Sequence, residues 1–137
     1  MKLVLAAPGL EINATNDRGR TALRDQSSWG RTRNVELLLA DQRVDPNLTD
    51  ANGETPLNIA ANLGEDRCVE LLLADARVDP NLTEVNGQTP LGTAANQGRD
   101  RCVELLLADA RVGPNLTAVN GETPLYTAAN QGKDRCV

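Results

Sequence analysis

Three cysteines are the residues with the most evident capacity for chemistry. Cys68, Cys102 and Cys136 are separated by steps of 34 residues, and a valine follows each of them. An odd number of cysteines at one recurring position argues against a disulfide framework. Equivalent positions of stacked helical units lie roughly a helix diameter apart, about 10 Å, which is beyond the reach of a disulfide. Single cysteines at this spacing do not form a zinc motif either. We therefore interpret them as small packed hydrophobic residues, typical of a reducing compartment.

Other catalytic side chains are sparse. The chain contains no histidine, which removes the commonest general base and the commonest metal ligand. Carboxylates such as Glu36, Glu70 and Glu104 recur at the same 34-residue step, so we interpret them as a solvated face rather than as acid–base pairs. The sequence predicts no enzyme activity, no metal and no cofactor.

Four segments satisfy the acceptor rule for N-linked glycans, and they begin at Asn13, Asn47, Asn81 and Asn115. Glycosylation requires secretion, but the opening apolar run from Leu3 to Ala7 is shorter than the apolar region of a signal peptide. We therefore expect these asparagines to be structural residues of a loop in a cytoplasmic protein.

The overall charge excludes some partners. Fourteen basic residues stand against 19 acidic ones, giving a net charge of -5 and a pI of about 4.7. This charge repels phosphate backbones and anionic lipids, so nucleic acid and membrane surfaces are not expected partners. No stretch of the sequence is long and apolar enough to cross a membrane.

A self-similarity with a step of 34 residues organises the whole chain. The segment Asn-Gly-Glu-Thr-Pro-Leu at 52–57 returns with one change at 86–91 and unchanged at 120–125. Such a step is the signature of a repeat array, in which each unit is too small to bury a core alone and must stack on its neighbours. We divide the chain into repeats 19–52, 53–86 and 87–120, with partial repeats at 1–18 and 121–137.

Each repeat is predicted to contain two helices, as the unit 53–86 illustrates. Thr55 can cap a helix that has Pro56 as its first residue, and Gly64 can end it after about two turns. Asp66 can cap a second helix over Arg67–Ala74, whose apolar residues have helical spacing.

The rest of the unit is predicted to be a loop and a projecting turn. Pro80 removes a backbone donor and pushes Asp79 toward an extended conformation. Asn86-Gly87 predicts a tight turn, because both residues tolerate positive φ.

These residues carry a resemblance to a known family. The unit resembles the ankyrin repeat at Gly53, Thr55-Pro56-Leu57, Ala60-Ala61, Gly64, Val69, Leu72-Leu73 and Asn81, and the resemblance covers essentially the whole chain. It implies an all-α ankyrin-repeat solenoid of stacked antiparallel helix pairs with projecting β-turn or hairpin loops. It also implies that the asparagines equivalent to Asn81 are potential hydroxylation targets.

The chain departs from the family pattern in two places. The histidine that commonly follows Thr-Pro-Leu is replaced by Asn58, Gly92 and Tyr126, so we expect its hydrogen bonds to be absent. The loop after the second helix is one residue longer than in the usual repeat of about 33 residues, and it carries Pro46, Pro80 and Pro114.

The resemblance also implies a function. Ankyrin arrays bind proteins on a concave face made from the turn tips and the exposed side of the first helices. Carried over to this chain, the partner-binding residues are Asp17, Arg18, Arg20, Ser28, Trp29, Ala51, Asn52, Glu54, Asn58, Asn62, Leu63, Val85, Asn86, Gln88, Asn96, Gln97, Val119, Asn120, Glu122, Tyr126, Asn130 and Gln131. Trp29 stands out, because aromatic anchors carry a large share of interface energy. Trp29 is either partly exposed and part of the recognition surface, which is our hypothesis, or a cover for a poorly formed helix.

A comparison between repeats bears on the same question. Repeats 53–86 and 87–120 differ at the pairs 54/88, 58/92, 59/93, 63/97, 65/99, 79/113 and 84/118. Most of these lie on the turn or the first helix, which fits both a variable binding surface on a fixed scaffold and drift at positions of low burial. The sequence therefore leaves a protein-interaction module and a structural spacer or targeting segment of a larger protein as alternatives.

Two regions of the array are predicted to be weak. In repeat 19–52, Asp25, Gln26 and Ser27 replace the apolar residues of the next repeat, so its first helix should be the least stable. The partial repeats at both ends lack polar capping units and look excised from a longer array. We therefore expect end-to-end self-association or a shortfall in stability.

Overall fold

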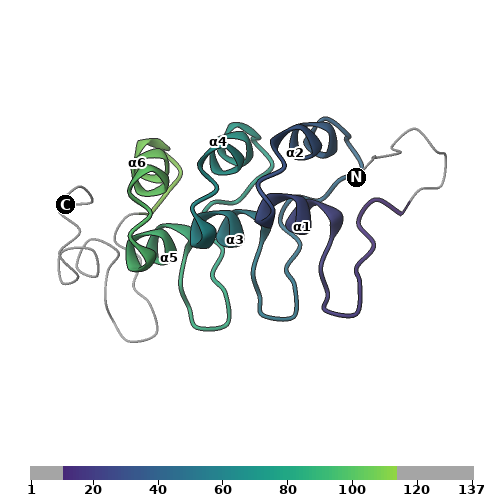
Figure 1. Ribbon diagram of the computed structural model, residues 1–137, viewed down its shortest axis with the longest axis horizontal. Helices are drawn as coiled ribbons and strands as arrows, with labels where there is room; N and C mark the ends of the chain where they lie inside the picture. The colour runs from purple at the N-terminus through teal and green to yellow at the C-terminus, as the bar shows by residue number, and fades with distance from the viewer. Residues whose placement is uncertain (1–10, 114–137) are drawn as a thin grey trace.

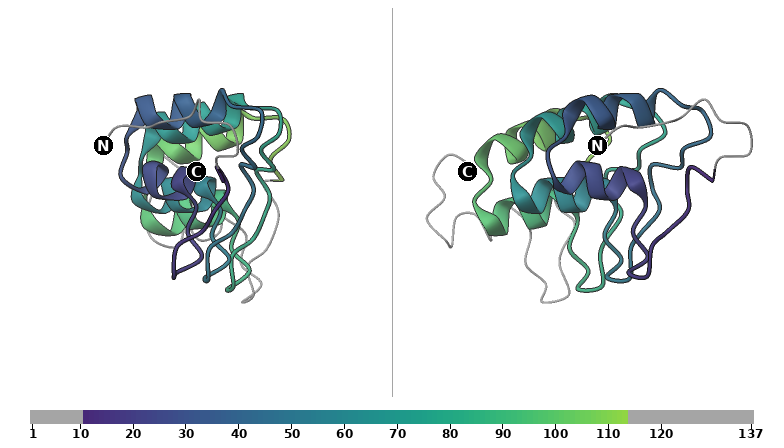
Figure 2. Two further views of the ribbon diagram at one scale, coloured as in Figure 1. Left: turned by 90° about the vertical axis from the view of Figure 1, so that its right-hand side faces the viewer. Right: turned by 45° about the vertical axis from the view of Figure 1, so that its right-hand side comes forward.

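The computed structural model describes residues 11–113, which contain six helices in two layers (Figure 1). One layer is formed by the first helices of the repeats, α1 (Ala22–Ser28), α3 (Pro56–Leu63) and α5 (Pro90–Gln97). The other is formed by α2 (Thr32–Leu39), α4 (Asp66–Ala74) and α6 (Asp100–Ala108). Each helix contacts its pair partner and the equivalent helix of a neighbouring described repeat, and the turns project to one side (Figure 2). The stacked helical array is as predicted.

The first helices begin and end as their sequences predict. The hydroxyl oxygens of Thr21, Thr55 and Thr89 accept hydrogen bonds from the backbone N–H three residues later. This satisfies a donor that has no partner within the helix. Helices α3 and α5 end at Gly64 and Gly98, whose φ angles of 74° and 69° are open mainly to glycine.

The start of the second helices differs from the prediction. In α4 the N-cap residue is Glu65, which makes no side-chain capping bond, and Asp66 is already helical. The Asp66 carboxylate instead accepts a hydrogen bond from the Cys102 thiol of the next repeat at 3.1 Å. Asp66 therefore joins two repeats rather than capping its own helix.

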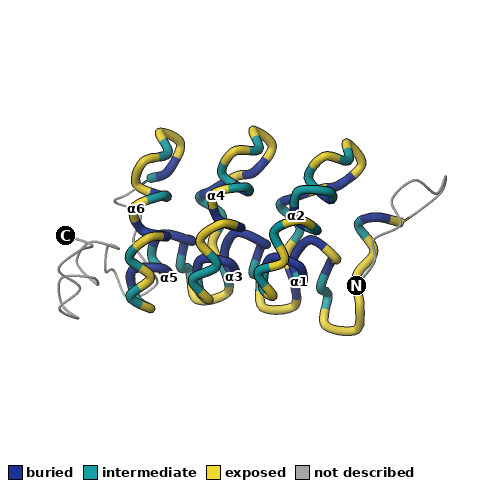
Figure 3. The backbone as a smooth tube through the Cα atoms, turned by 45° about the horizontal axis from the view of Figure 1, so that its top comes forward, coloured by how far each residue is buried: buried dark blue, intermediate teal, exposed yellow. Residues whose placement is uncertain are grey.

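The core is a cluster of buried, mostly aliphatic side chains from both layers of helices. Figure 3 shows buried segments of the backbone in both layers along the array. Equivalent positions of the three repeats that the structure describes contribute to the core, including Leu23, Leu57 and Leu91 from the first helices and Leu38, Leu72 and Leu106 from the second helices. Burial of one such side chain contributes about 1.5–3 kcal/mol. Ala60, Ala61, Ala94 and Ala95 are also buried, and their small size lets α3 and α5 pack closely.

In each described turn, a glycine is the residue that adopts positive φ. The Gly87 N–H donates to Glu84 O at 2.8 Å, and the Glu84 N–H donates to Gln88 O at 3.0 Å. Gly87 has a φ of 77°, whereas no residue other than glycine in the described part of the chain has positive φ. The tight turn predicted at Asn86-Gly87 therefore forms with Gly87 as its one left-handed residue, because glycine adopts this conformation without a Cβ clash.

One backbone hydrogen bond joins each pair of neighbouring described turns. The Val85 N–H donates to Asn52 O at 3.1 Å. A Cβ at Gly53 would lie 3.2 Å from the Val85 nitrogen, so this close approach also requires glycine.

The loop after the second helix, which is one residue longer than usual, contains an arginine that contacts the preceding repeat. Arg77 Nη2 donates to Leu39 O, the last helical carbonyl of α2, at 2.7 Å, and Nη1 donates to Val44 O at 3.0 Å. Asp75 holds the guanidinium with two bonds of 2.7 and 3.0 Å. Arg111 makes the equivalent contacts one repeat later, to Leu73 O and Val78 O. The loop geometry thus caps orphan carbonyls of the previous helix.

The core of the first described repeat contains two polar side chains in addition to its aliphatic ones. Gln26 and Ser27 are buried at the places of the buried alanines Ala60 and Ala61. Gln26 Oε1 accepts from Asn34 Nδ2 at 2.9 Å, but Ser27 Oγ has no hydrogen-bond partner within residues 11–113. Helix α1 nevertheless forms.

Several expectations fall outside the described residues. The incomplete repeats at both ends, and self-association through them, involve residues 1–10 and 114–137. Among the described helices, none has the length and apolar character needed to span a membrane.

Candidate functional site

The predicted partner-binding residues lie mainly on one surface. We define the inner face as the surface formed by the described turns, which project beyond the first-helix layer, and by the accessible side of α1, α3 and α5 (Figure 1). The exposed members are Asp17, Arg18, Trp29, Ala51, Asn52, Leu63, Val85, Asn86 and Gln97. The half-buried members are Arg20, Ser28, Glu54, Asn62, Gln88 and Asn96.

A hollow of about 190 Å³ lies on the inner face between the turns and α3 and α5. Six of the predicted residues line it, namely Glu54, Asn62, Asn86, Gln88, Asn96 and Gln97. Its wall also includes Glu84 and Thr93, which our prediction missed. Both occupy positions at which neighbouring repeats differ in sequence, so that comparison contained the signal that could have found them.

Glu54 is a carboxylate held in an unfavourable environment. Its side chain is only 17% exposed, and its Oε1 lies 3.8 Å from Arg24 Nη2. Burial raises the pKa of Glu54, and the negative charge of Asp50 raises it further. The charges of Arg24 and Arg20 lower it by less. Glu54 therefore brings a partly desolvated carboxylate to the wall of the hollow.

Glu84 contributes both charge and turn geometry to the same hollow. Its Oε1 accepts hydrogen bonds from the backbone N–H groups of Asn86 at 2.8 Å and Gln88 at 3.0 Å. Asp50 accepts equivalent bonds from Asn52 and Glu54 one repeat earlier. The side chain before each turn thus organises the turn.

Arg24 connects the first described repeat to the next turn. Its Nε donates to Asp50 Oδ2 at 3.0 Å, and the two side chains are 6% and 2% exposed. Removing one member would leave a buried charge without its partner, which is strongly destabilising. Arg24 is therefore a structural residue below the inner face.

Asn58 corrects two of our expectations. It is 1% exposed, so it does not belong to the surface that a partner could reach. As the third residue of α3 it accepts from the Thr55 N–H at 2.9 Å, while its own N–H donates to Thr55 Oγ1 at 3.1 Å. Its Nδ2 also donates to Leu82 O at 3.2 Å. Asparagine thus keeps a hydrogen-bond network at the position where the resemblance implies histidine.

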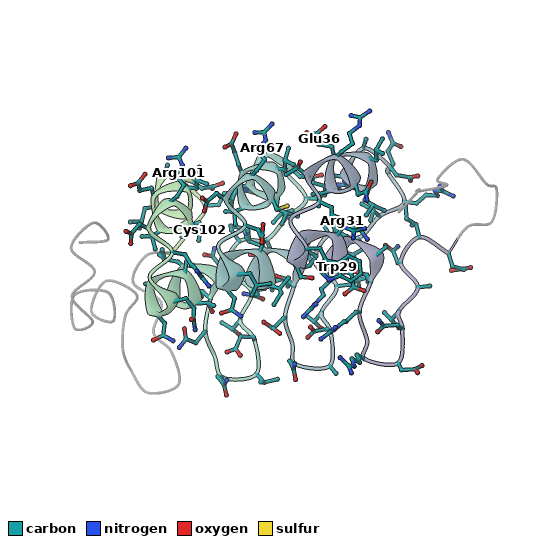
Figure 4. All side chains as sticks on the ribbon, viewed as in Figure 1. Trp29, Arg31, Glu36, Arg67, Arg101 and Cys102 are labelled. Carbon is teal, nitrogen blue, oxygen red and sulfur yellow. The ribbon has the colours of Figure 1, made fainter. Side chains whose placement is uncertain are left out.

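Trp29 is exposed at the end of α1 (Figure 4). Its side chain is 53% exposed, and the Arg31 guanidinium carbon lies 5.1 Å from the ring centroid. The expectation of partial exposure is confirmed. Figure 4 also shows Glu36, Arg67 and Arg101 on the far side of the second-helix layer.

The remaining predicted residues, Val119, Asn120, Glu122, Tyr126, Asn130 and Gln131, lie outside the described part of the chain.

Comparison with known proteins agrees with the architecture. A sequence profile described as ankyrin repeats (3 copies) matches residues 1–84, 27–117 and 73–137, which together cover the whole chain. This chain belongs to the ankyrin repeat family. No curated protein sequence matches it significantly.

The recurring asparagines of this ankyrin array form a ladder along the loops. Asn47 Nδ2 donates to Arg77 O at 2.8 Å, and Asn47 Oδ1 accepts from the Asp79 N–H at 2.8 Å. Asn13 and Asn81 make the same pair of contacts with the next loop. Each amide joins two repeats, as expected for structural residues.

The thiols of the ankyrin core are poor nucleophiles. Cys68 and Cys102 are free and buried. Burial raises the pKa of Cys68 to about 11. Burial, together with the hydrogen bond to Asp66, also raises the pKa of Cys102. Very little thiolate is present at neutral pH, so these cysteines pack rather than react.

Proposed function

We propose that this chain is a non-enzymatic protein–protein interaction module that binds a protein or peptide on its inner face. The hollow is the observation that carries the proposal, because it unites turn and first-helix residues from two repeats. Exposed apolar side chains accompany it on the inner face: Trp29 at 53%, Leu63 at 41% and Val85 at 67%. A polar hollow beside exposed apolar anchors is a typical composition for a protein-binding surface.

A matched pair of leucines provides the test. Leu63 on α3 and Leu107 on α6 are both 41% exposed, but only Leu63 belongs to the inner face. The tagged full chain would be used to capture proteins from an extract of its source organism. We expect Leu63→Ala and Trp29→Ala each to reduce capture of a specific partner by about fivefold or more, as for interface residues worth over 1 kcal/mol.

The control is Leu107→Ala, which should leave capture unchanged. Equal losses for Leu63→Ala and Leu107→Ala would contradict binding on the inner face. If wild-type chain captures no specific partner, the role of structural spacer or targeting segment of a larger protein is supported instead.

A cytoplasmic, reducing location is part of the proposal. It is supported by the free thiols of Cys68 and Cys102, which are typical of such compartments. Fluorescence imaging of the tagged full-length protein in its own cells checks this, and accumulation in a secretory compartment would contradict it.

A further inference from the structure

One repeat carries the net charge of the whole molecule. In repeat 53–86 the basic residues Arg67 and Arg77 stand against seven acidic ones, namely Glu54, Glu65, Asp66, Glu70, Asp75, Asp79 and Glu84. Basic and acidic residues are equal in number in every other segment of the chain, so this excess equals the net charge of -5. The negative potential is therefore concentrated in the middle of the array.

Away from the inner face, several of these carboxylates have partners within the array. Glu70 forms an ion pair with Arg67 on α4, and Asp75 pairs with Arg77 at 2.7 Å. Asp66 accepts the hydrogen bond of the Cys102 thiol. These groups are used in local structure.

Two further carboxylates, Glu54 and Glu84, line the hollow of the inner face, and Glu84 also accepts hydrogen bonds from its own turn. Glu54 and Glu84 approach the hollow from successive turns. Burial raises the pKa of Glu54, and the negative charges of Asp50 and Glu84 raise it further. Asp50 adds a third negative charge, while the nearest cation, Arg24, is 6% exposed and hydrogen-bonded to Asp50. Arg20 is the other basic group near Glu54. A cation entering the hollow would relieve this repulsion.

The rest of the lining suits a peptide backbone. Asn62, Asn86, Gln88, Asn96 and Gln97 present amide groups, each with both a donor and an acceptor. Amides at this density can pair with the alternating N–H and C=O groups of an extended segment. Exposed Val85 lies on the same turn as Glu84, and Leu63 follows Asn62 on α3.

We propose that the partner enters the hollow as an extended peptide segment and places a lysine or arginine side chain between Glu54 and Glu84. The amides bond to its backbone, and the carboxylates select its charge. This inference rests on the proposed function and adds the chemistry of the partner.

The test uses four blocked heptapeptides of the form Gly-Ser-Gly-X-Gly-Ser-Gly, with X as arginine, lysine, glutamine or glutamate. Each is titrated to about 20 mM, a range that detects millimolar binding, into the full chain labelled with ¹⁵N. We expect the arginine and lysine peptides to shift the amide signals of 84–88 and 93–97. The glutamine and glutamate peptides should bind at least about fivefold more weakly, as expected for one ion pair of about 1 kcal/mol.

Charge-neutral variants identify the groups responsible. The double variant Glu54→Gln, Glu84→Gln should weaken the basic peptides by about fivefold or more. The amide oxygen that this variant introduces at position 84 can still accept hydrogen bonds from the turn N–H groups, and unfolding in urea checks that the fold is kept. The double variant Glu70→Gln, Glu104→Gln removes the same two units of charge from the second-helix layer and should leave affinity within about twofold.

Each outcome separates this inference from the proposed function. If glutamine or glutamate peptides bind the hollow as tightly as arginine peptides, the charge selection is overturned while inner-face binding stands. No shift with any basic peptide also overturns it. If the captured partner is lost with Leu63→Ala but kept with the double glutamine variant, only this inference is contradicted.

Discussion

At the scale of single residues, some groups on or below the inner face stabilise the fold, whereas others do not. Asn58 and Arg24 occupy equivalent positions of successive repeats, and both are buried in hydrogen bonds to the following loop or turn. Glu54, by contrast, has a raised pKa, so its charge is unfavourable in the folded chain. A group kept at a cost to stability is a candidate for binding.

Ser27 offers a residue-scale prediction of stability. Its hydroxyl is buried and lacks a hydrogen-bond partner, whereas the equivalent Ala61 and Ala95 fill the same position without a polar atom. We expect Ser27→Ala to raise the free energy of unfolding by about 1 kcal/mol, measured by urea denaturation. The reverse change Ala61→Ser should lower it by about 1–2 kcal/mol. No gain from Ser27→Ala would mean that the hydroxyl is satisfied in solution.

Asp41 and Glu54 should change the stability of the fold in opposite directions as the pH falls. The side chain and backbone N–H of Arg43 hold the pKa of Asp41 at about 2, below its ordinary 3.8. The stability that Asp41 contributes is therefore complete above about pH 4 and lost as the pH falls toward 2. The raised pKa of Glu54 acts in the other direction, because protonation relieves an unfavourable charge. Titration of the side-chain ¹³C carboxyl signals checks both, and a midpoint for Asp41 near its ordinary value would contradict the Arg43 contact.

At the scale of elements, the arginine of each loop is the main addition to the helix pairs. Arg77 reaches the carbonyl groups of Leu39 and Val44 while Asp75 holds its guanidinium in place. The same contacts recur at Arg111. The loop thus contributes polar bonds between neighbouring repeats.

Loss of this arginine should destabilise the array. We expect Arg77→Ala to lower the free energy of unfolding by about 1–2 kcal/mol, since hydrogen bonds from a charged donor are lost at a partly exposed position. Arg67→Ala is the matched control, because Arg67 makes only a surface ion pair with Glu70, and its effect should stay within about 0.5 kcal/mol. Urea denaturation of both variants measures the difference. Equal effects would show that the Arg77 contacts are not formed in solution.

The turns make a further prediction at this scale. Gly53 has a φ of 73° and lies against the Val85 nitrogen of the next turn. We expect Gly53→Ala to destabilise the chain by about 1–2 kcal/mol through the left-handed backbone alone. Thermal unfolding measures the effect, and an unchanged midpoint would contradict this packing of the turns.

The elements also show what sequence reasoning could reach. Threonine caps, terminal glycines and aliphatic spacing predicted the first helices within a residue, because these signals are local. The contact of Asp66 with Cys102 and the reach of Arg77 to α2 were not predictable, since they join residues 36 and 38 positions apart. Asn58 was misplaced because its position in the first helix does not reveal that its side chain turns back onto Thr55.

At the scale of the whole molecule, stability is a sum over contacts between neighbouring pairs of helices. Helix α3 packs between α1 and α5 and buries alanine, whereas the core of α1 contains Gln26 and Ser27. We therefore expect amide hydrogen exchange in α1 to proceed through openings of lower free energy than in α3. Ser27→Ala should narrow the difference in opening free energy between α1 and α3. Equal protection of α1 and α3 would contradict a weak first repeat.

The most direct test of inner-face binding is amide hydrogen–deuterium exchange of the full chain, measured alone and with its captured partner. Binding on the inner face predicts that the partner slows exchange at the turns 50–54 and 84–88 and in the helices α3 and α5. It predicts little change in α2, α4 and α6. Protection confined to the second-helix layer would contradict it.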